Sequence, residues 1–317
     1  AILESNHICQ GTTAHTTAKI TSRHGLIYNK IKNKIGKNLA KQYADANESA
    51  IHEYKKIIED NQIDCDYIPQ SAFIYTEQDE YIQKIQDEVK TASSLGIEAS
   101  YVNKIPFPME IKAAIRFNNQ AQFHPRKYLL GLAKVIENKV QIFENSKAQD
   151  IKEVGDNYII TTERGKKVRA KNLIIASHYP FYNKHGAYFT RIYTERSYIV
   201  AIRAKEKYPG GMYINAEEPA RSLRHQSSEE GELIFVVGEH HKTGQSQNTN
   251  EHYEALIDFA NNVFTVEDIP YRWSTQDCMT LDGIPYVGNF TSNTPNMYIA
   301  TGFGKWGMTN SMVSAMI

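Results

Sequence analysis

Cysteine is scarce in this sequence, with three residues in 317, at positions 9, 65 and 278, and no Cys-x-x-Cys pair among them. A disulfide scaffold and a zinc ribbon are therefore both poorly supported, and a cytoplasmic location fits this usage best. Net charge is absent as well, because 36 Lys and Arg balance 36 Asp and Glu. A balanced chain gives no electrostatic reason to expect nucleic acid or an anionic membrane as a partner.

Long apolar runs are also missing. The longest, such as Leu233–Val237, fall far short of a membrane span, and no signal peptide of basic and then apolar residues opens the chain. The sequence does not begin with Met, and Ala1–Glu4 already has the pattern of a strand. The closing helical pattern of 308–317 stops without Gly, Asn or a cationic last turn. We therefore expect a piece of a larger chain, with a short natural protein that has frayed ends as the alternative.

Helical and strand-like periods alternate along the rest of the chain. Apolar residues at helical spacing predict helices around 51–58, 82–96, 125–135 and 253–260. Strands that together look like an antiparallel meander are predicted at 140–143, 158–161 and 167–170. The run 173–176 is apolar throughout, as in a strand that is buried on both faces, and 197–237 alternates like a sheet with one exposed face.

This order does not describe a simple alternating doubly wound sheet. It predicts a mixed α/β fold, in which a Rossmann-like nucleotide-binding lobe is interrupted by a β-rich substrate-binding lobe. Two lobes also suit a chain that is longer than one hydrophobic core usually serves. We assign the nucleotide-binding lobe to 1–60, 111–180 and 272–317. The substrate-binding lobe takes 61–110 and 181–271.

Three short segments carry residues that suit a nucleotide cofactor. Glu4 ends the opening strand, where dinucleotide-binding folds place an acid that accepts hydrogen bonds from ribose hydroxyls. The stretch 10–19 is rich in small residues and hydroxyls, which let a planar ligand approach the backbone. The stretch 300–309 places three glycines just before a helix, a corner that suits an anion or a carbonyl group. Each has a plainer interpretation, namely a solvated acid, a threonine-rich loop and a glycine-rich turn, and 273–288 is expected to be mainly structural.

Together these segments resemble the FAD-dependent D-amino-acid-oxidase superfamily. The loop 11–16 resembles the one that follows the acid of the second strand, Ile175-Ala176-Ser177 resembles the strand that returns to the flavin, and 302–309 resembles the C-terminal flavin-binding segment. The whole chain is similar to glycine-oxidase-like flavoproteins that often carry a C-terminal Rieske iron–sulfur domain. The Gly-x-Gly-x-x-Gly turn of the family is not in this sequence and would precede residue 1. Rieske ligand pairs are not in it either, so such a domain would lie beyond residue 317.

The resemblance implies FAD as the cofactor and gives individual residues a role. Glu4 would hold the adenosine ribose, Ala148 would offer backbone atoms to the adenine, and Ala176 lies in the strand that returns to the flavin. The flavin and its diphosphate would be lined by Thr12, Thr13, His15, Thr16 and Thr17. The isoalloxazine ring and the ribityl chain would contact Gly302, Phe303, Gly304, Lys305 and Gly307. A positive Lys305 near the pyrimidine edge would stabilise an anionic reduced flavin.

The stretch Thr12–Thr16 is similar to the loop of sarcosine and dimethylglycine dehydrogenases, in which a histidine at the place of His15 is bonded covalently to the flavin. Those enzymes usually have Trp where this chain has Ala14, so covalent and non-covalent attachment both stay open. Arg224 is the candidate to clamp a substrate carboxylate, because a guanidinium binds carboxylate bidentately; a surface ion pair is the alternative. His124 and the pair His240-His241 suggest a proton shuttle or a metal pair, but a structural part is favoured, and neither a metal site nor a catalytic residue is assigned.

The reaction that the resemblance implies is oxidation of a carbon–nitrogen bond in a small amine or amino acid. A hydride passes to flavin N5, and the resulting imine hydrolyses. Two alternatives stay open. One is a flavin dehydrogenase that passes electrons to an iron–sulfur partner. The other is a non-catalytic remnant or binding module without a cofactor, an alternative that the missing phosphate-binding turn keeps open. For the same reason the chain as given need not be active on its own.

Overall fold

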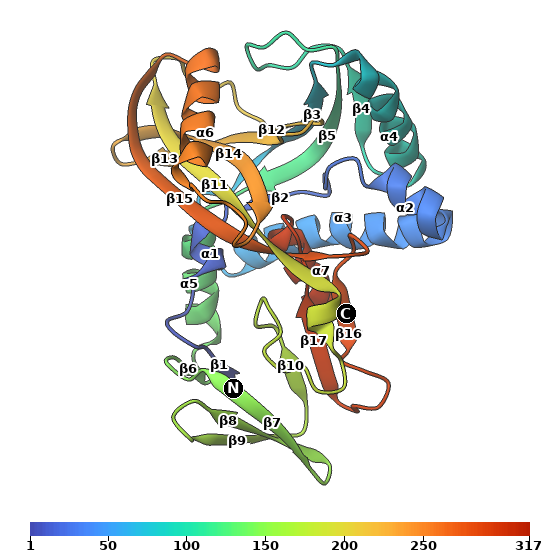
Figure 1. Ribbon diagram of the computed structural model, residues 1–317, viewed down its shortest axis with the longest axis vertical. Helices are drawn as coiled ribbons and strands as arrows, with labels where there is room; N and C mark the ends of the chain where they lie inside the picture. Colours follow the sequence, from blue (N-terminus) through green and yellow to red (C-terminus); the bar gives the residue numbers. More distant parts are fainter.

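A nine-stranded sheet forms the broad part of the protein, which is drawn uppermost in Figure 1. The computed structural model describes residues 1–317. In spatial order the strands are β15 (Val266–Thr280), β11 (Ile192–Ala204), β14 (Gly231–Lys242), β13 (Arg221–Ser228), β12 (Met212–Asn215), β3 (Ile68–Thr76), β5 (Ala113–Gln122) and β2 (Lys19–Ile20), with β4 (Ala99–Val102) also beside β5. Strands β12 and β3 pair in parallel, and the other pairs are antiparallel.

Three smaller sheets make up the narrower part, which lies lowest in Figure 1. The first pairs β1 (Ile2–Leu3) in parallel with β6 (Ile142–Phe143). The second is a meander of β7 (Ala148–Val154), β8 (Asn157–Thr162) and β9 (Lys167–Ala170). The third places β17 (Met297–Thr301) between a parallel and an antiparallel neighbour, β10 (Leu173–Ile175) and β16 (Tyr286–Asn289).

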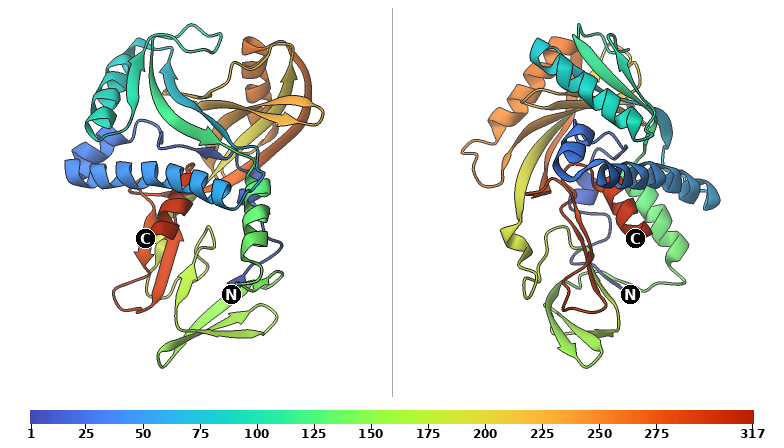
Figure 2. Two further views of the ribbon diagram at one scale, coloured as in Figure 1. Left: turned by 180° about the vertical axis from the view of Figure 1, so that it is seen from behind. Right: turned by 90° about the vertical axis from the view of Figure 1, so that its right-hand side faces the viewer.

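Seven α-helices surround these sheets, and α3 runs beneath the large sheet (Figure 2). They are α1 (Thr12–His15), α2 (Tyr28–Ile35), α3 (Lys37–Asp60), α4 (Ile82–Ser94), α5 (Pro125–Ile136), α6 (Asn250–Val263) and α7 (Gly307–Met316), with short 3-10 turns at Asp79–Tyr81 and Tyr188–Thr190. Helix α5 begins where the sequence predicts, since Pro125 occupies its first turn and His124 Nδ1 accepts a hydrogen bond from Lys127 N at 3.4 Å. No helix combines the length and the apolarity that crossing a membrane requires.

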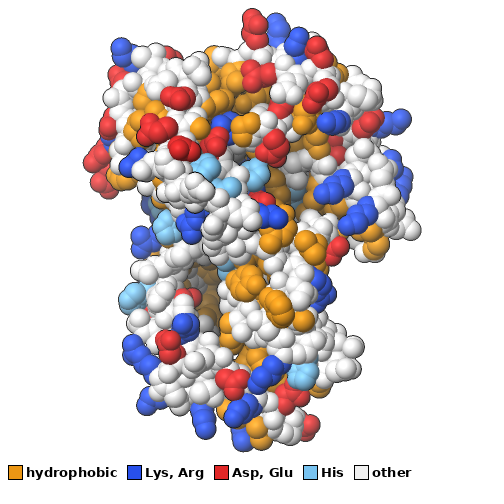
Figure 3. All heavy atoms as spheres, in the orientation of Figure 1, with side chains coloured by type: hydrophobic (Ala, Val, Ile, Leu, Met, Phe, Trp, Pro, Cys, Tyr) orange, Lys and Arg blue, Asp and Glu red, His pale blue; other side chains and the backbone are white.

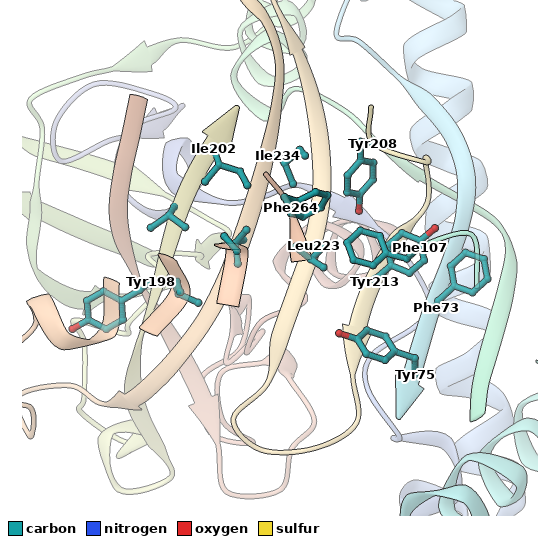
Figure 4. Close-up of a cluster of buried hydrophobic side chains, with 14 of the residues drawn as sticks. Phe73, Tyr75, Phe107, Tyr198, Ile202, Tyr208, Tyr213, Leu223, Ile234 and Phe264 are labelled. Atoms are coloured by element: carbon teal, nitrogen blue, oxygen red, sulfur yellow. The ribbon is translucent and has the colours of Figure 1, made fainter. Parts of the chain in front are cut away.

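Four hydrophobic clusters hold the layers together. One joins the large sheet to α6 and contains an aromatic group around Phe107, Tyr208 and Tyr213, which Figure 4 shows. A second packs α2 and α4 against β3 and β5, and a third packs α3, α5 and α7 around β2. The fourth joins the meander to β10 and β17. Cationic and anionic side chains are interspersed over the face in Figure 3, as expected for a chain with balanced charge.

Two details of the predicted strands are wrong. The run 140–143 does not belong to the meander, because β6 pairs in parallel with β1 and the first meander strand is β7. The run 173–176 is not buried on both faces. Ile174 is 68% exposed, so the face of β10 on which it lies is open to solvent. A continuous apolar run shows that a strand is present, but it does not show what covers each face.

The mixed α/β fold is as predicted from the sequence. The division into two lobes with the stated boundaries stays a prediction. The nine-stranded sheet takes β2 and β5 from the stretches that we assigned to the nucleotide lobe, and β3 and β11 to β14 from those assigned to the substrate lobe. One sheet therefore connects the two groups of stretches, and its β15 edge brings the candidate segments together.

Candidate functional site

The segment Gln276–Cys278 of β15 is the meeting point of three segments that are far apart in the sequence. Thr12 Oγ1 donates a hydrogen bond to the Gln276 carbonyl at 3.4 Å, and His178 Nε2 donates to the same oxygen at 2.9 Å. Two residues further along, the Cys278 carbonyl accepts a hydrogen bond from Gly304 N at 2.9 Å. The threonine loop, the turn after β10 and the glycine corner therefore all attach to one short stretch of backbone.

Further hydrogen bonds brace these segments against one another. Trp273 Nε1 donates to the His15 carbonyl at 2.9 Å, and this bond fixes α1 against β15. Thr301 Oγ1 donates to the His178 carbonyl at 2.6 Å, which joins the end of β17 to the turn after β10. We expected residues 273–277 to be mainly structural, and the structure gives them the additional part of positioning both candidate loops.

The glycine corner depends on glycine at position 302. Gly302 has a φ of 72°, and a Cβ built there would lie 2.2 Å from Thr280 Cγ2. Any other residue would meet both backbone strain and a steric clash. Gly304 has a φ of 56°, also in the left-handed region. The chain can therefore turn closely over β15 before α7 begins at Gly307.

Lys305 anchors this corner to the large sheet. Its ammonium group contacts Asp277 Oδ2 at 3.0 Å, Glu195 Oε2 at 3.1 Å and Ser197 Oγ at 3.0 Å. Both carboxylates are largely buried, and their combined charge exceeds that of the lysine. The ammonium group of Lys305 is therefore already paired with two carboxylates. Its expected role at the pyrimidine edge of a flavin stays a prediction.

The remaining residues of the threonine loop form local contacts. Thr16 Oγ1 accepts a hydrogen bond from Ala18 N at 3.2 Å, and Thr17 Oγ1 accepts one from Lys19 Nζ at 3.3 Å. Thr13 is half-buried, and His15 is exposed, with its Nδ1 against the Gly11 carbonyl. Nothing in these contacts distinguishes covalent from non-covalent attachment of a flavin, so both stay open.

Glu4 and Ala148 lie in the narrower part of the protein. Glu4 follows β1, and its Oε1 accepts hydrogen bonds from Asn6 N at 2.9 Å and Ser5 Oγ at 3.1 Å. Ala148 is the first residue of β7, and the Glu4 carbonyl accepts a hydrogen bond from Ser146 N at 2.8 Å. Glu4 and Ala148, the two residues expected to contact the adenosine, therefore lie near each other, because Ser146 precedes Ala148 by only two residues. Ala176 directly follows β10 and is exposed.

Arg224 is not a surface ion pair. It points from β13 into the protein, with 1% of its surface exposed, and its guanidinium carbon lies 5.1 Å from the centre of the Phe235 ring. Nη2 donates to Gln226 Oε1 at 3.1 Å, whereas Nε and Nη1 have no partner. Burial lowers the pKa of Arg224 to about 9, so the side chain is still a cation at neutral pH.

Sequence reasoning missed Arg23 and His24, which lie shortly after β2. Arg23 is fully buried, and none of its three guanidinium nitrogens has a hydrogen-bond partner. His24 stacks on Trp306 with ring centres 5.0 Å apart. A basic pair after a short strand is visible in the sequence, but its burial depends on contacts with residues that are distant in the sequence, such as Trp306 and Thr309.

The hydrogen bonds of His24 fix its tautomer. Thr309 Oγ1 donates to the Thr21 carbonyl at 3.0 Å, so it accepts from His24 Nε2 at 2.9 Å. His24 Nδ1 then accepts from the Tyr43 hydroxyl at 2.6 Å. Burial lowers the pKa of His24 to about 3, so the ring is neutral at ordinary pH. His24 thereby ties α3, α7 and Trp306 of the glycine corner together.

The other histidines considered in the sequence have structural partners. His124 caps α5. His241 Nε2 lies 2.9 Å from the Tyr198 hydroxyl, and its ring stacks on His252 with centres 4.7 Å apart. His240 lies 3.7 Å from Glu218. These contacts agree with the structural role that the sequence favoured for these histidines. Proton transfer by them stays untested.

An open cleft of about 600 Å³ lies beside the threonine loop. It is lined by Ala14, His15, Leu233, Phe235 and Pro270–Trp273. Phe235 separates it from Arg224, and Trp273 meets Phe235 edge-on with ring centres 5.6 Å apart. Such a volume is of the size that small-molecule sites usually have.

The family model described as FAD dependent oxidoreductase matches residues 1–317. The chain belongs to this family. It is also 41% identical over all 317 residues to a Bacillus subtilis (strain 168) protein that is provisionally named the Rieske 2Fe-2S iron-sulfur protein YhfW. The chain spans 62% of the length of that relative. The resemblance stated from the sequence is thereby confirmed.

Two solved structures share the fold at low sequence identity. Glycine oxidase from Geobacillus kaustophilus superposes with a TM-score of 0.77 at 14% identity, over 99% of this chain and 85% of that one. An L-amino acid deaminase from Proteus vulgaris, with its specific insertion sequence deleted, gives a TM-score of 0.75 at 14% identity, over 99% and 80%. At such identity these likenesses establish the fold alone.

FAD is the cofactor of this family, and the residues present suit it. The space beside Gly11 and Gly307 is open, since a Cβ at either position would meet no heavy atom within 4 Å. Between these openings the threonine loop and the glycine corner both attach to Gln276–Cys278. Backbone without side chains and short hydroxyl groups are what a planar, electron-accepting cofactor needs beside it.

Proposed function

We propose that this chain is the flavin-binding part of an enzyme that oxidises a carbon–nitrogen bond in a small amine or amino acid. The observation that carries the proposal is the meeting of three segments at Gln276–Cys278. The buried Arg224 on β13 supports it. The names of two similar structures, a glycine oxidase and an L-amino acid deaminase, point to the same class of substrate. A cytoplasmic location, expected from the scattered cysteines, is part of this proposal.

The residues of this chain would divide the work as follows. Thr12, Gly302 and Gly304 would hold the cofactor ring against β15, and Arg224 would clamp the carboxylate of the substrate. Phe235 would cover the Arg224 guanidinium on its cleft side and help to exclude water. Bound FAD supplies the acceptor for a hydride from the substrate carbon. An amine that enters neutral needs no dedicated base, and accordingly none is assigned.

Anaerobic mixing of the flavin-loaded protein with amines tests the proposal. Glycine, sarcosine, proline and alanine are each added, and the yellow absorbance of the oxidised flavin is followed. We expect at least one of these amines to bleach it. The product would be the corresponding oxo acid with free amine or ammonia or, from proline, the cyclic imine, which keeps its nitrogen. A protein that carries stoichiometric FAD but is bleached by none of a broad amine panel contradicts the proposal. A protein that binds no flavin would instead support the non-catalytic alternative.

A second candidate is a dehydrogenase that passes electrons to an iron–sulfur partner. The observation that favours it is the name of the Bacillus subtilis relative, of which this chain spans 62%. The two candidates differ in how the reduced flavin is reoxidised. Rapid reoxidation by dissolved oxygen, with one hydrogen peroxide per flavin, supports an oxidase. Slow reaction with oxygen and rapid reaction with a Rieske-type acceptor supports the dehydrogenase.

A further inference from the structure

Three cationic side chains lie where β2 and β13 approach each other. Arg23 follows β2, Lys19 belongs to β2, and Arg224 belongs to β13. Lys19 Nζ donates to Ser222 Oγ at 2.6 Å, and Ser222 lies two residues before Arg224 on the same face of the strand. Burial, together with the charges of Arg23 and Arg224, holds the pKa of Lys19 well below its ordinary value. Lys19 is therefore close enough to both arginines to be affected by their charge.

None of these cations has an anionic partner in the protein. Lys19 contacts only the hydroxyl groups of Thr17 and Ser222. Arg224 donates to an amide oxygen, and Arg23 donates to nothing. The acid that approaches this region through Gln226 is Asp66, which already pairs with Lys127 at 2.9 Å. Two fully buried guanidinium groups thus lack a counter-charge, although proteins almost always supply one when they bury a charge.

The two arginines lie against different aromatic side chains. The Arg23 guanidinium carbon lies 5.4 Å from the centre of the Trp306 ring, beside the glycine corner. The Arg224 guanidinium lies over Phe235, which lines the open cleft. A single carboxylate has two oxygens and one charge, so it would leave most of this positive charge unmatched. A ligand with two separate anionic groups would match one group to each arginine and place Lys19 between them.

We propose that the substrate is an amine that carries two carboxylates, one held by Arg224 and the other by Arg23, with Lys19 shared between them. That the substrate is an amine rests on the proposed function. That it carries two carboxylates rests on the buried cations alone. It gives Arg23 a part in specificity, which the sequence did not suggest. It also explains why two partly unsatisfied guanidinium groups are retained at 0% and 1% exposure.

Binding of unreactive anions to the flavin-loaded, full-length protein tests the inference without turnover. Succinate and butyrate have the same number of carbons but two and one carboxylates, and inorganic phosphate carries its charge on one group. Calorimetry at pH 7.5 and constant ionic strength gives the three dissociation constants. We expect succinate to bind about tenfold to a hundredfold more tightly than butyrate, because it gains a second charge-assisted contact. Phosphate is expected to bind more weakly than succinate.

Two variants test whether Arg23 binds the second carboxylate. Arg23→Met keeps the length of the side chain and removes its charge, so we expect the preference for succinate over butyrate to disappear while the affinity for butyrate changes little. Arg224→Met should weaken both ligands. Arg116→Met, on the exposed face of β5, is the matched control and should change neither. If Arg23→Met does not fold, Arg23→Lys, which retains a charge, provides the second comparison and should keep part of the preference.

The outcomes separate this inference from the proposed function. Equal affinity for succinate and butyrate, tighter binding of phosphate than of succinate, or an unchanged preference in Arg23→Met overturns the two-carboxylate substrate. Bleaching of the flavin by monocarboxylate amino acids alone would then leave the proposed function standing. A clear succinate preference in a protein whose flavin no amine reduces would retain the two-anion site and overturn the amine chemistry.

Discussion

Arg224 shows at the scale of one residue how burial changes the meaning of a sequence signal. From the sequence, a substrate clamp and a surface ion pair were both open for this residue. The structure removes the second, because Arg224 is 1% exposed and has no acidic partner. Arg23 could not be found in the same way, since its burial depends on contacts made in the fold, such as the one with Trp306, which is distant in the sequence.

Replacing Arg224 by Met tests the clamp in turnover. The loss of a charge-assisted contact of about 1.5–3 kcal/mol should raise KM for a carboxylated amine by at least about tenfold. The value of kcat should change less, provided that the carboxylate is held equally in the ground state and the transition state. Steady-state kinetics with the best substrate give both constants, and Arg116→Met serves as the control. An unchanged KM would show that Arg224 does not bind the substrate.

His24 predicts how stability depends on acid. Its pKa is about 3 in the folded protein and near 6.5 when unfolded, so the unfolded state binds more protons between these values. This group therefore costs stability as pH falls below about 6.5, by at most about 1.4 kcal/mol per pH unit. Denaturant unfolding at a series of pH values between 7 and 4 gives the free energy of unfolding. It should fall less steeply with decreasing pH for His24→Gln than for the wild type. His52→Gln, at an exposed histidine, is the control. The same dependence of the free energy of unfolding on pH in all three proteins would contradict the prediction.

Gly302 predicts a steric effect that a second substitution relieves. Gly302→Ala adds a Cβ at 2.2 Å from Thr280 Cγ2 and places alanine at a φ of 72°. We expect a loss of about 2 kcal/mol or more in the free energy of unfolding and weaker FAD retention. Adding Thr280→Ser removes the clashing methyl group and should restore part of that loss. A Gly302→Ala protein as stable as the wild type would show that the corner is looser than described.

At the scale of elements, the sequence predicted which segments exist better than how they pair. Helices around 51–58, 82–96, 125–135 and 253–260 are present in α3, α4, α5 and α6. The run 140–143 was placed in the wrong sheet, because pairing with β1 depends on a partner nearly 140 residues away. The importance of Gln276–Cys278 was also missed, since its contribution comes from backbone carbonyls, which no residue type reveals.

Lys305 tests how the glycine corner is attached to the large sheet. Lys305→Met would leave Asp277 and Glu195 close together without their shared cation. Because both carboxylates are largely buried, we expect a loss of about 1–3 kcal/mol in the free energy of unfolding. Adding Asp277→Asn removes one of the two negative charges and should recover part of the loss. If the losses in the free energy of unfolding caused by Lys305→Met and Asp277→Asn simply add, the ion pair between these residues does not anchor the glycine corner.

At the scale of the whole molecule, the candidate site joins elements from both parts of the protein. The expected adenosine residues lie near β1 and β7 in the narrower part, whereas β15 and Arg224 belong to the large sheet. A ligand that contacts both parts should stabilise them together, because it binds the folded state only. The sequence indicated this through its resemblance to a known family, not through its periodicity.

Thermal unfolding in the presence of increasing FAD measures this coupling. The midpoint should rise with FAD concentration, by an amount that follows from the dissociation constant. AMP, which lacks the flavin ring, should raise it less, because the threonine loop and the glycine corner would have nothing to bind. A midpoint that FAD and AMP raise equally would restrict the site to the adenosine residues near β1.

The most direct measurement is a crystal structure of the flavin-loaded protein. The account predicts electron density for the isoalloxazine ring in contact with Thr12–His15 on one side and Gly302–Gly304 on the other, beside Gln276–Cys278. Density for the ring elsewhere, with neither segment in contact with it, would contradict the central claim that these segments form one flavin site.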